Sequence, residues 1–210
     1  MKGIRYQSRK YAKLETSINR VNEETIKAEH HQQKRKKAAG VDGVSKDEYE
    51  KELDKNVSEL IKRMKQFSYK PRAVRRTYIP KANGKMRPLE IPSYEDKLVQ
   101  GVMAGVLNDI YEERFCDSSY RYRQGRNGHD VVKIVNETIM TKKVNCVLEA
   151  DIKGFFDNVN HDWLMKFLEN DIADKNFLRY IKRFLKAGIM EGTEYQEREK
   201  GTPQGGLCLT

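Results

Sequence analysis

Residues 144–164, VNCVLEADIKGFFDNVNHDWL, decide how the rest of the chain is interpreted. A mainly apolar run, 144–150, ends in the carboxylate Asp151, and the aromatic residues Phe155 and Phe156 follow. This run predicts a buried strand that brings Asp151 to a rim, where a carboxylate can stay ionised. Because oxygen ligands suit Mg²⁺, Asp151 is a candidate metal ligand. Taken alone, such an acid is more often a helix cap or an acceptor of backbone hydrogen bonds.

The length of 210 residues allows one substantial core, or two small lobes that share a cleft. No run approaches the ~20 apolar residues of a membrane span, and the first residues lack the apolar core of a secretion signal. The three cysteines are widely spaced, which suits a reducing compartment. We therefore expect a cytoplasmic bacterial protein with no membrane partner.

The formal net charge of +10 is unevenly distributed. Residues 62–87 hold ten Lys or Arg and no Asp or Glu, and a second basic block occupies 34–37. Aromatic residues alternate with these charges, at Phe67, Tyr69 and Tyr78. Cations interleaved with aromatics favour a nucleic-acid partner, whose phosphates pair with the charges while rings stack on bases. The alternative is a solvated basic face.

Apolar residues at helical spacing predict helices over about 47–67, 98–110, 131–140, 161–169 and 175–187. Residues 1–37 form a basic extension with helical spacing. Two short extended runs flank residues 82–84, and a second hairpin is predicted around Glu191 and Gly192. The predicted fold class is α+β, with antiparallel strands packed against helices.

The segment ADIKGFFDNVNHDWL (150–164) resembles the first catalytic motif of reverse transcriptases, in particular those encoded by group II introns. Four further segments match this family in the same order along the chain. They are AGVDGVS (39–45), YIPKANGKMRPLEIPSYEDKLVQ (78–100), IYEERFCDSSYRYRQGRNGHDVV (110–132) and KGTPQGG (200–206). The resemblance implies the fingers-palm fold of right-hand polymerases. The fingers would span 38–100, and a partial palm with the returning fingers and the template loop would span 101–210.

The resemblance also implies roles for single residues around a metal and a nucleotide. Asp151 and the carbonyl oxygen of Ile152 would hold Mg²⁺. Phe155 would lie under the sugar of the incoming deoxynucleoside triphosphate and exclude a 2′-hydroxyl.

Other residues would contact the nucleotide or the template. Lys81 and Arg87, on either side of a hairpin turn, would neutralise the triphosphate. Gln204 would contact the nucleotide or the templating base, and Arg75 and Arg76 would face either of these less specifically.

The sequence departs from the family pattern in two places. Arg121 and Gln124 stand where a small residue and a proline are usual, which affects the local loop geometry. The chain also ends before the Tyr-Ala-Asp-Asp hairpin that supplies two further carboxylates. We therefore expect this polypeptide alone not to polymerise, although its parent does, and we expect surfaces left uncovered to favour a homodimer.

Three functions follow as hypotheses. The first is an RNA-directed DNA polymerase of a bacterial group II intron, which binds intron RNA and an RNA template with a DNA primer. The second is a non-catalytic RNA-binding fragment that assists intron splicing. The third is a related reverse transcriptase, of a retron or a diversity-generating element. The histidines are predicted to be solvated or capping groups, among them His30 and His161.

Overall fold

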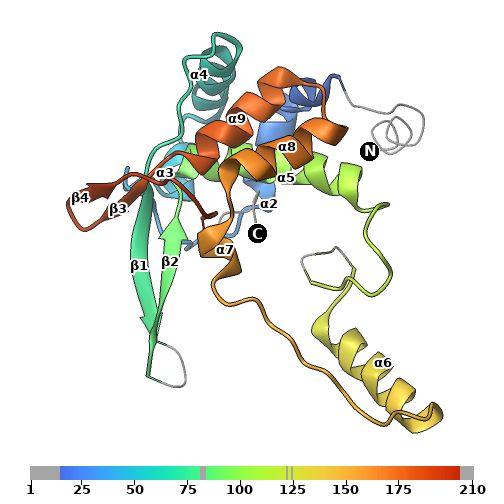
Figure 1. Ribbon diagram of the computed structural model, residues 1–210. Coiled ribbons are helices and arrows are strands. Elements are labelled where there is room, and N and C mark those ends of the chain that lie inside the picture. Colours follow the sequence, from blue (N-terminus) through green and yellow to red (C-terminus); the bar gives the residue numbers. More distant parts are fainter. Residues whose placement is uncertain (1–14, 81–83, 122, 124, 204–210) are drawn as a thin grey trace.

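Helix α5 (Tyr94–Tyr111) is central to the computed structural model, which describes residues 15–80, 84–121, 123 and 125–203 (Figure 1). The predicted stripe of apolar residues is confirmed, because Leu98, Val99 and Met103 have no exposed surface. Each side chain of this size stabilises the fold by about 1.5–3 kcal/mol when it is fully buried. Two acids, Glu95 and Asp96, occupy the first turn, where the helix dipole favours negative charge.

Two helices near the C-terminal end of the described chain complete one side of the core. They are α8 (His161–Asp171) and α9 (Lys175–Leu185). In α9, Phe177, Ile181 and Leu185 are buried at spacings of four residues, which places them on one face. The predicted cap of α8 is confirmed, since the Asn160 side chain accepts a hydrogen bond from the backbone of Trp163.

The N-terminal helices also pack around α5, and the first of them contacts α9 as well. A short 3₁₀ helix, η1 (Ser17–Arg20), precedes α2 (Glu23–Gln32), so helical structure in the basic extension is confirmed for its described part. The helix predicted over 47–67 is divided into α3 (Lys46–Glu50) and α4 (Leu53–Lys65). Buried residues of α2, α4, α5, α8 and α9 belong to one hydrophobic cluster.

A four-stranded sheet has the order β2-β1-β3-β4. Strands β1 (Val74–Pro80) and β2 (Met86–Ile91) form the first predicted hairpin, and β3 (Ile189–Glu191) and β4 (Glu194–Gln196) form the second. The predicted antiparallel pairing is confirmed within each hairpin, whereas β1 and β3 pair in parallel, so the sheet is mixed. Helices α5, α8 and α9 lie between these two strands in the chain, and the second hairpin returns to the edge of the first, where β3 runs in the same direction as β1 (Figure 1).

Helix α6 (Gly128–Thr141) lies apart from the body (Figure 1). The predicted buried strand over 144–151 was wrong. Residues 143–152 have no regular structure, and the side chains of Val147 and Leu148 are 73% and 91% exposed. A strand is held by hydrogen bonds to a neighbour, and none of the described strands pairs with this segment.

No helix within the described part of the chain combines the length and the apolar character that crossing a membrane requires.

Candidate functional site

The predicted metal ligands lie on the exposed segment before α7 (Phe155–Asn158). Asp151 is exposed, and Ile152 is 70% exposed. Among the described residues no three His, Cys, Asp or Glu side chains are grouped so that they could hold a metal ion. A carboxylate and a carbonyl oxygen are the donor types that Mg²⁺ takes, but one carboxylate falls short of the set that two metal ions need. The described residues therefore do not make up a two-metal site by themselves.

Phe155 begins the single turn of α7. Gly154 precedes it with a φ of 63°, in the left-handed region where glycine is favoured, and this reverses the chain out of the extended segment. The Phe155 ring is 53% exposed and meets Phe156 edge to face, with ring centroids 5.4 Å apart. The side chain of Asn158 donates to the Gly154 carbonyl oxygen at 2.9 Å and closes the turn. An aromatic surface is thus presented to solvent four residues after Asp151.

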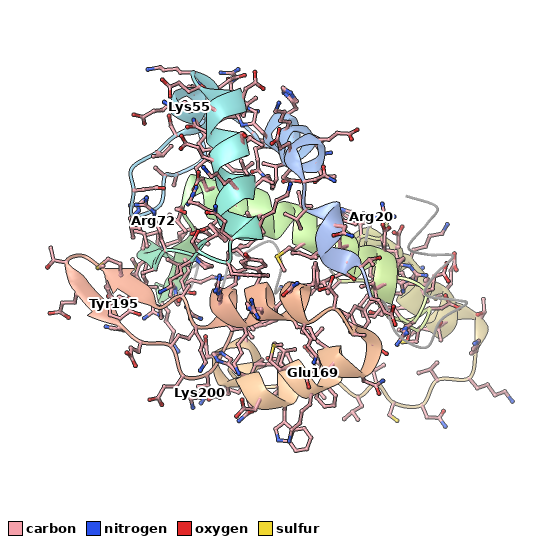
Figure 2. All side chains as sticks on the ribbon, turned by 90° about the horizontal axis from the view of Figure 1, so that it is seen from above. Arg20, Lys55, Arg72, Glu169, Tyr195 and Lys200 are labelled. Atoms are coloured by element: carbon pink, nitrogen blue, oxygen red, sulfur yellow. The ribbon has the colours of Figure 1, made fainter. Side chains whose placement is uncertain are left out.

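Residues 156–161 and 200–202 are hydrogen-bonded to each other, and we call this unit the α7 junction. The backbone N–H of Gly201 donates to Val159 and that of Thr202 to Phe156, each at 2.8 Å. Asn160 and Lys200 form an antiparallel bridge. The Lys200 ammonium, beside α8 in Figure 2, donates to the side chain of Asn158 at 2.8 Å. The junction therefore joins two segments that the sequence analysis singled out independently.

Gly201 has a structural reason to be glycine. Its φ is +81°, and an added Cβ would lie 2.8 Å from the carbonyl oxygen of Asp157 and 2.9 Å from that of Phe156. Any side chain would push the loop away from α7. This close approach fixes the loop just before Gln204, which itself lies outside the described residues.

His161 is the residue of this site that the sequence analysis misjudged. Its side chain is buried, at 5% exposure, and Nε2 lies 2.7 Å from the Gly201 carbonyl oxygen. Because a carbonyl oxygen only accepts, Nε2 must carry the proton. The prediction of a surface or capping group was therefore wrong. No spacing signal could have revealed the contact, since the partner is 40 residues further along the chain.

The β1–β2 hairpin carries the predicted triphosphate ligands. Arg87 is exposed on β2, opposite Ile79 of β1. Lys81 lies outside the described residues. The base of the hairpin is anchored by the buried carboxylate of Asp96, which accepts from the hydroxyl of Ser93 at 2.6 Å and the backbone of Arg72 at 3.0 Å. Burial raises the pKa of the Asp96 carboxyl.

Arg75 and Arg76 both make contacts within the protein. Arg75 donates twice to the carbonyl oxygen of Ala39, at 2.7 and 3.0 Å, and so ties β1 to the turn at 38–45. Arg76 pairs with the buried carboxylate of Glu90 at 2.8 Å, and Arg198 pairs with the other oxygen of the same group. Their predicted contacts with template or nucleotide stay predictions. Both guanidinium groups already have a structural role.

A second histidine was also misjudged. His30 of α2 was predicted to be solvated, yet its side chain has no exposed surface and Nδ1 lies 2.9 Å from the hydroxyl oxygen of Tyr94. Burial and the neighbouring Lys46 lower the pKa of His30. His30 thereby ties the basic extension to α5.

Comparison with known proteins decides the family. Residues 79–208, more than half of the chain, match the family described as "Reverse transcriptase (RNA-dependent DNA polymerase)". The chain belongs to the reverse transcriptase family. The resemblance predicted from the sequence motifs is thus confirmed, and the mixed α and β structure agrees with a reverse transcriptase fold.

Two of the relatives below are named as intron proteins. The chain is 37% identical over 172 residues to "Group II intron-encoded protein LtrA" of Lactococcus lactis subsp. cremoris. The match covers 81% of this chain and 28% of that protein. It is 34% identical over 175 residues to "Protein YkfC" of Escherichia coli (strain K12), and this match covers 80% of this chain and 45% of that protein. A 91 kDa protein in the cob intron of Schizosaccharomyces pombe is 37% identical over 157 residues, and this match covers 74% of this chain and 18% of that protein. The chain spans less than half the length of each of these relatives.

Proposed function

We propose that this chain supplies the fingers and part of the palm of an RNA-directed DNA polymerase encoded by a group II intron. The α7 junction is the observation that carries the proposal. It holds the turn with Phe155 against the loop that leads to Gln204, so the two nucleotide-facing segments of the family pattern are one hydrogen-bonded unit. The relatives named as intron-encoded proteins support the same assignment.

In the proposed polymerase each residue has a distinct task. Asp151, with the carbonyl oxygen of Ile152, contributes part of a Mg²⁺ site, and the missing carboxylates come from outside the described residues. When bound, the metal ions supply Lewis-acid stabilisation of the phosphoryl charge. Phe155 lies against the nucleotide sugar. Arg87 and Lys81 neutralise the triphosphate, and Gln204 contacts the nucleotide or templating base.

This assignment makes the 210-residue chain inactive on its own. One carboxylate leaves most of the phosphoryl charge in the transition state unbalanced. The full-length protein would copy an RNA template from a DNA primer and bind intron RNA through its basic surface.

A second candidate function is RNA binding that assists splicing without catalysis. It is favoured by the net charge of +10 and by a relative named "Nuclear intron maturase 1, mitochondrial" of Arabidopsis thaliana, 28% identical over 108 residues. This function would use the same basic surfaces but would not need Asp151.

Substitution of Asp151→Ala in the full-length protein separates the two candidates. We expect RNA-templated primer extension to fall by at least about a hundredfold, because a lost metal ligand removes several kcal/mol of transition-state stabilisation. The RNA dissociation constant should stay within about twofold, since a carboxylate makes no phosphate contact. Extension that survives the substitution would contradict the polymerase assignment of Asp151. Splicing assistance that survives while extension is lost would show that both activities reside in one protein.

We also propose that the 210-residue chain self-associates through residues 144–152 and α6. Large apolar side chains are exposed along this surface, among them Met140, Val147 and Leu148 at 76%, 73% and 91%. Large apolar side chains that gather at a surface are typically covered in an assembly. Light scattering should show a dimer or a larger species that Leu148→Lys dissociates. A wild-type monomer at every concentration would exclude this association.

A further inference from the structure

The outward face of α9 is a stripe of cations. Lys175, Arg179, Lys182 and Lys186 follow one another at intervals of four, three and four residues, and all four are exposed. Such spacing places side chains on one side of a helix, here over about 16 Å of its length. Helix α9 contains no acidic residue.

A second element adds to this stripe. The chain that leaves α4 carries the exposed Phe67, which Lys65 and Lys70 flank. The Arg179 guanidinium lies 4.4 Å from the centroid of the Phe67 ring, a cation–π contact. We define the α9 surface by these seven side chains, namely Lys65, Phe67, Lys70, Lys175, Arg179, Lys182 and Lys186.

The α9 surface is held rigidly. The hydroxyl group of Tyr180 donates to the carbonyl oxygen of Met64 at 2.7 Å. Arg183 donates to the carbonyl oxygens of Phe67, at 2.9 Å, and of Tyr69. Phe67 itself has a φ of 56°, an unusual conformation that these contacts maintain. The cations are therefore presented on a fixed scaffold, which lowers the entropy lost when they bind a ligand.

The described part of the chain leaves the positive charges of the α9 surface without a paired carboxylate. Among the described residues, none of its six cations forms an ion pair with a carboxylate. The nearest acid in the chain, Asp174, is buried, and its oxygens accept from the backbone of Ile18, Asn176 and Phe177. Six like charges on one face repel one another until a polyanion pairs with them.

The place of this surface in the fold separates it from the candidate site. Helices α4 and α9 lie at the end of the body away from the tip of the β1–β2 hairpin, and the turn of α7 lies between the two (Figure 1). A polyanion bound to the α9 surface would thus be distinct from a template bound near the hairpin.

We propose that the α9 surface binds the phosphate backbone of folded RNA, with Phe67 stacking on an exposed base or sugar. A rigid row of cations suits the regular phosphates of an RNA helix, and one ring among cations is the arrangement that nucleic-acid surfaces use. This inference deepens the proposed function, since it names the face that holds structured RNA while the hairpin end faces the template.

Binding of an RNA hairpin of about 16 base pairs tests the surface. The variant Arg179→Gln/Lys182→Gln/Lys186→Gln is compared with Lys133→Gln/Lys142→Gln/Lys143→Gln, which removes the same charge from exposed positions on and after α6. We expect the first variant to lose at least about tenfold in affinity and to reduce the slope of log K against log salt by about 2 to 3. The control should change affinity by no more than about threefold. Equal losses in the two variants would mean that only net charge matters and would overturn the proposal.

Two further measurements complete the test. Phe67→Ala should weaken binding of the hairpin without altering the salt slope, because stacking releases no counterions. Vesicles of phosphatidylserine and phosphatidylcholine test the competing anionic partner. A higher affinity for these vesicles than for the RNA hairpin, lost in the α9 variant, would overturn the proposal in favour of a lipid surface.

The test of the α9 surface can be told apart from the test of the polymerase assignment. If Asp151→Ala leaves primer extension intact while the α9 variant loses RNA affinity, the proposed function fails and the α9 surface stands. If Asp151→Ala abolishes extension while the α9 variant binds the hairpin as the wild type does, the α9 surface fails alone.

Discussion

The Nε2 atom of His161 lies 2.7 Å from the carbonyl oxygen of Gly201, and this contact joins the start of α8 to the loop that precedes Gln204. Both groups are buried, so the hydrogen bond is shielded from water. The same loop has no room for a side chain at Gly201. His161 is therefore a positioning residue of the α7 junction.

Replacement of His161 by Ala should leave the Gly201 carbonyl oxygen buried without a donor. We expect the free energy of unfolding to fall by about 1–3 kcal/mol, measured by denaturant titration. His161→Gln retains an N–H donor of similar reach and should restore part of the loss. Equal stability of the two variants would show that the hydrogen bond does not hold the loop.

The carboxylate of Glu90 is shared by Arg76 and Arg198 and is only 4% exposed. Glu90→Ala leaves a buried guanidinium without a counter-charge, and we expect it to destabilise the protein by about 3–5 kcal/mol. Glu52→Ala, which breaks an exposed pair with Lys55, is the matched control and should have little effect. Thermal unfolding of both variants makes the comparison. Similar losses would mean that burial does not determine the strength of these pairs.

The lowered pKa of His30 predicts how stability depends on pH. The folded state resists protonation of this buried imidazole, whereas the unfolded chain takes up the proton near its ordinary pKa of about 6.5. The unfolded state therefore binds more protons as the pH falls below that value. The stability present above about pH 6.5 is lost progressively on acidification.

Unfolding titrations at about pH 7.5 and about pH 5.5 measure this effect. The wild type should lose more stability between the two values than His30→Gln, which cannot titrate. A pH dependence of stability that the substitution leaves unchanged would contradict this role of His30.

The sequence correctly predicted the helices and hairpins that nearby residues determine. The core helices α5 and α9 follow from apolar spacing, and both hairpins follow from turn residues between extended runs. The strand over 144–151 was predicted from the same kind of pattern and was wrong, because its formation depends on a partner strand rather than on its own residues. His30 and His161 were missed for a related reason, since each is buried by contacts with distant parts of the chain.

The candidate site also has a part that the sequence indicated and a part that only the structure shows. Motif order along the chain indicated Asp151, Phe155, Arg87 and the loop at 200–206, and the family assignment is confirmed. The structure adds that Arg75 and Arg76 are held by Ala39 and Glu90, which no residue pattern could show. The structural role of these arginines comes from their partners, a backbone carbonyl oxygen and a buried carboxylate.

The most direct test of the account is the choice of sugar by the full-length protein when it extends an RNA-templated DNA primer by one nucleotide. Our central claim is that the α7 junction presents Phe155 to the incoming nucleotide. Phe155→Ala should raise kcat/KM for a ribonucleotide relative to the matching deoxynucleotide by at least about tenfold, because a bulky ring no longer excludes the 2′-hydroxyl. Phe167→Ala, which removes a similarly exposed ring from α8, should leave the ratio unchanged. An unchanged ratio in Phe155→Ala, with extension otherwise intact, would contradict the claim.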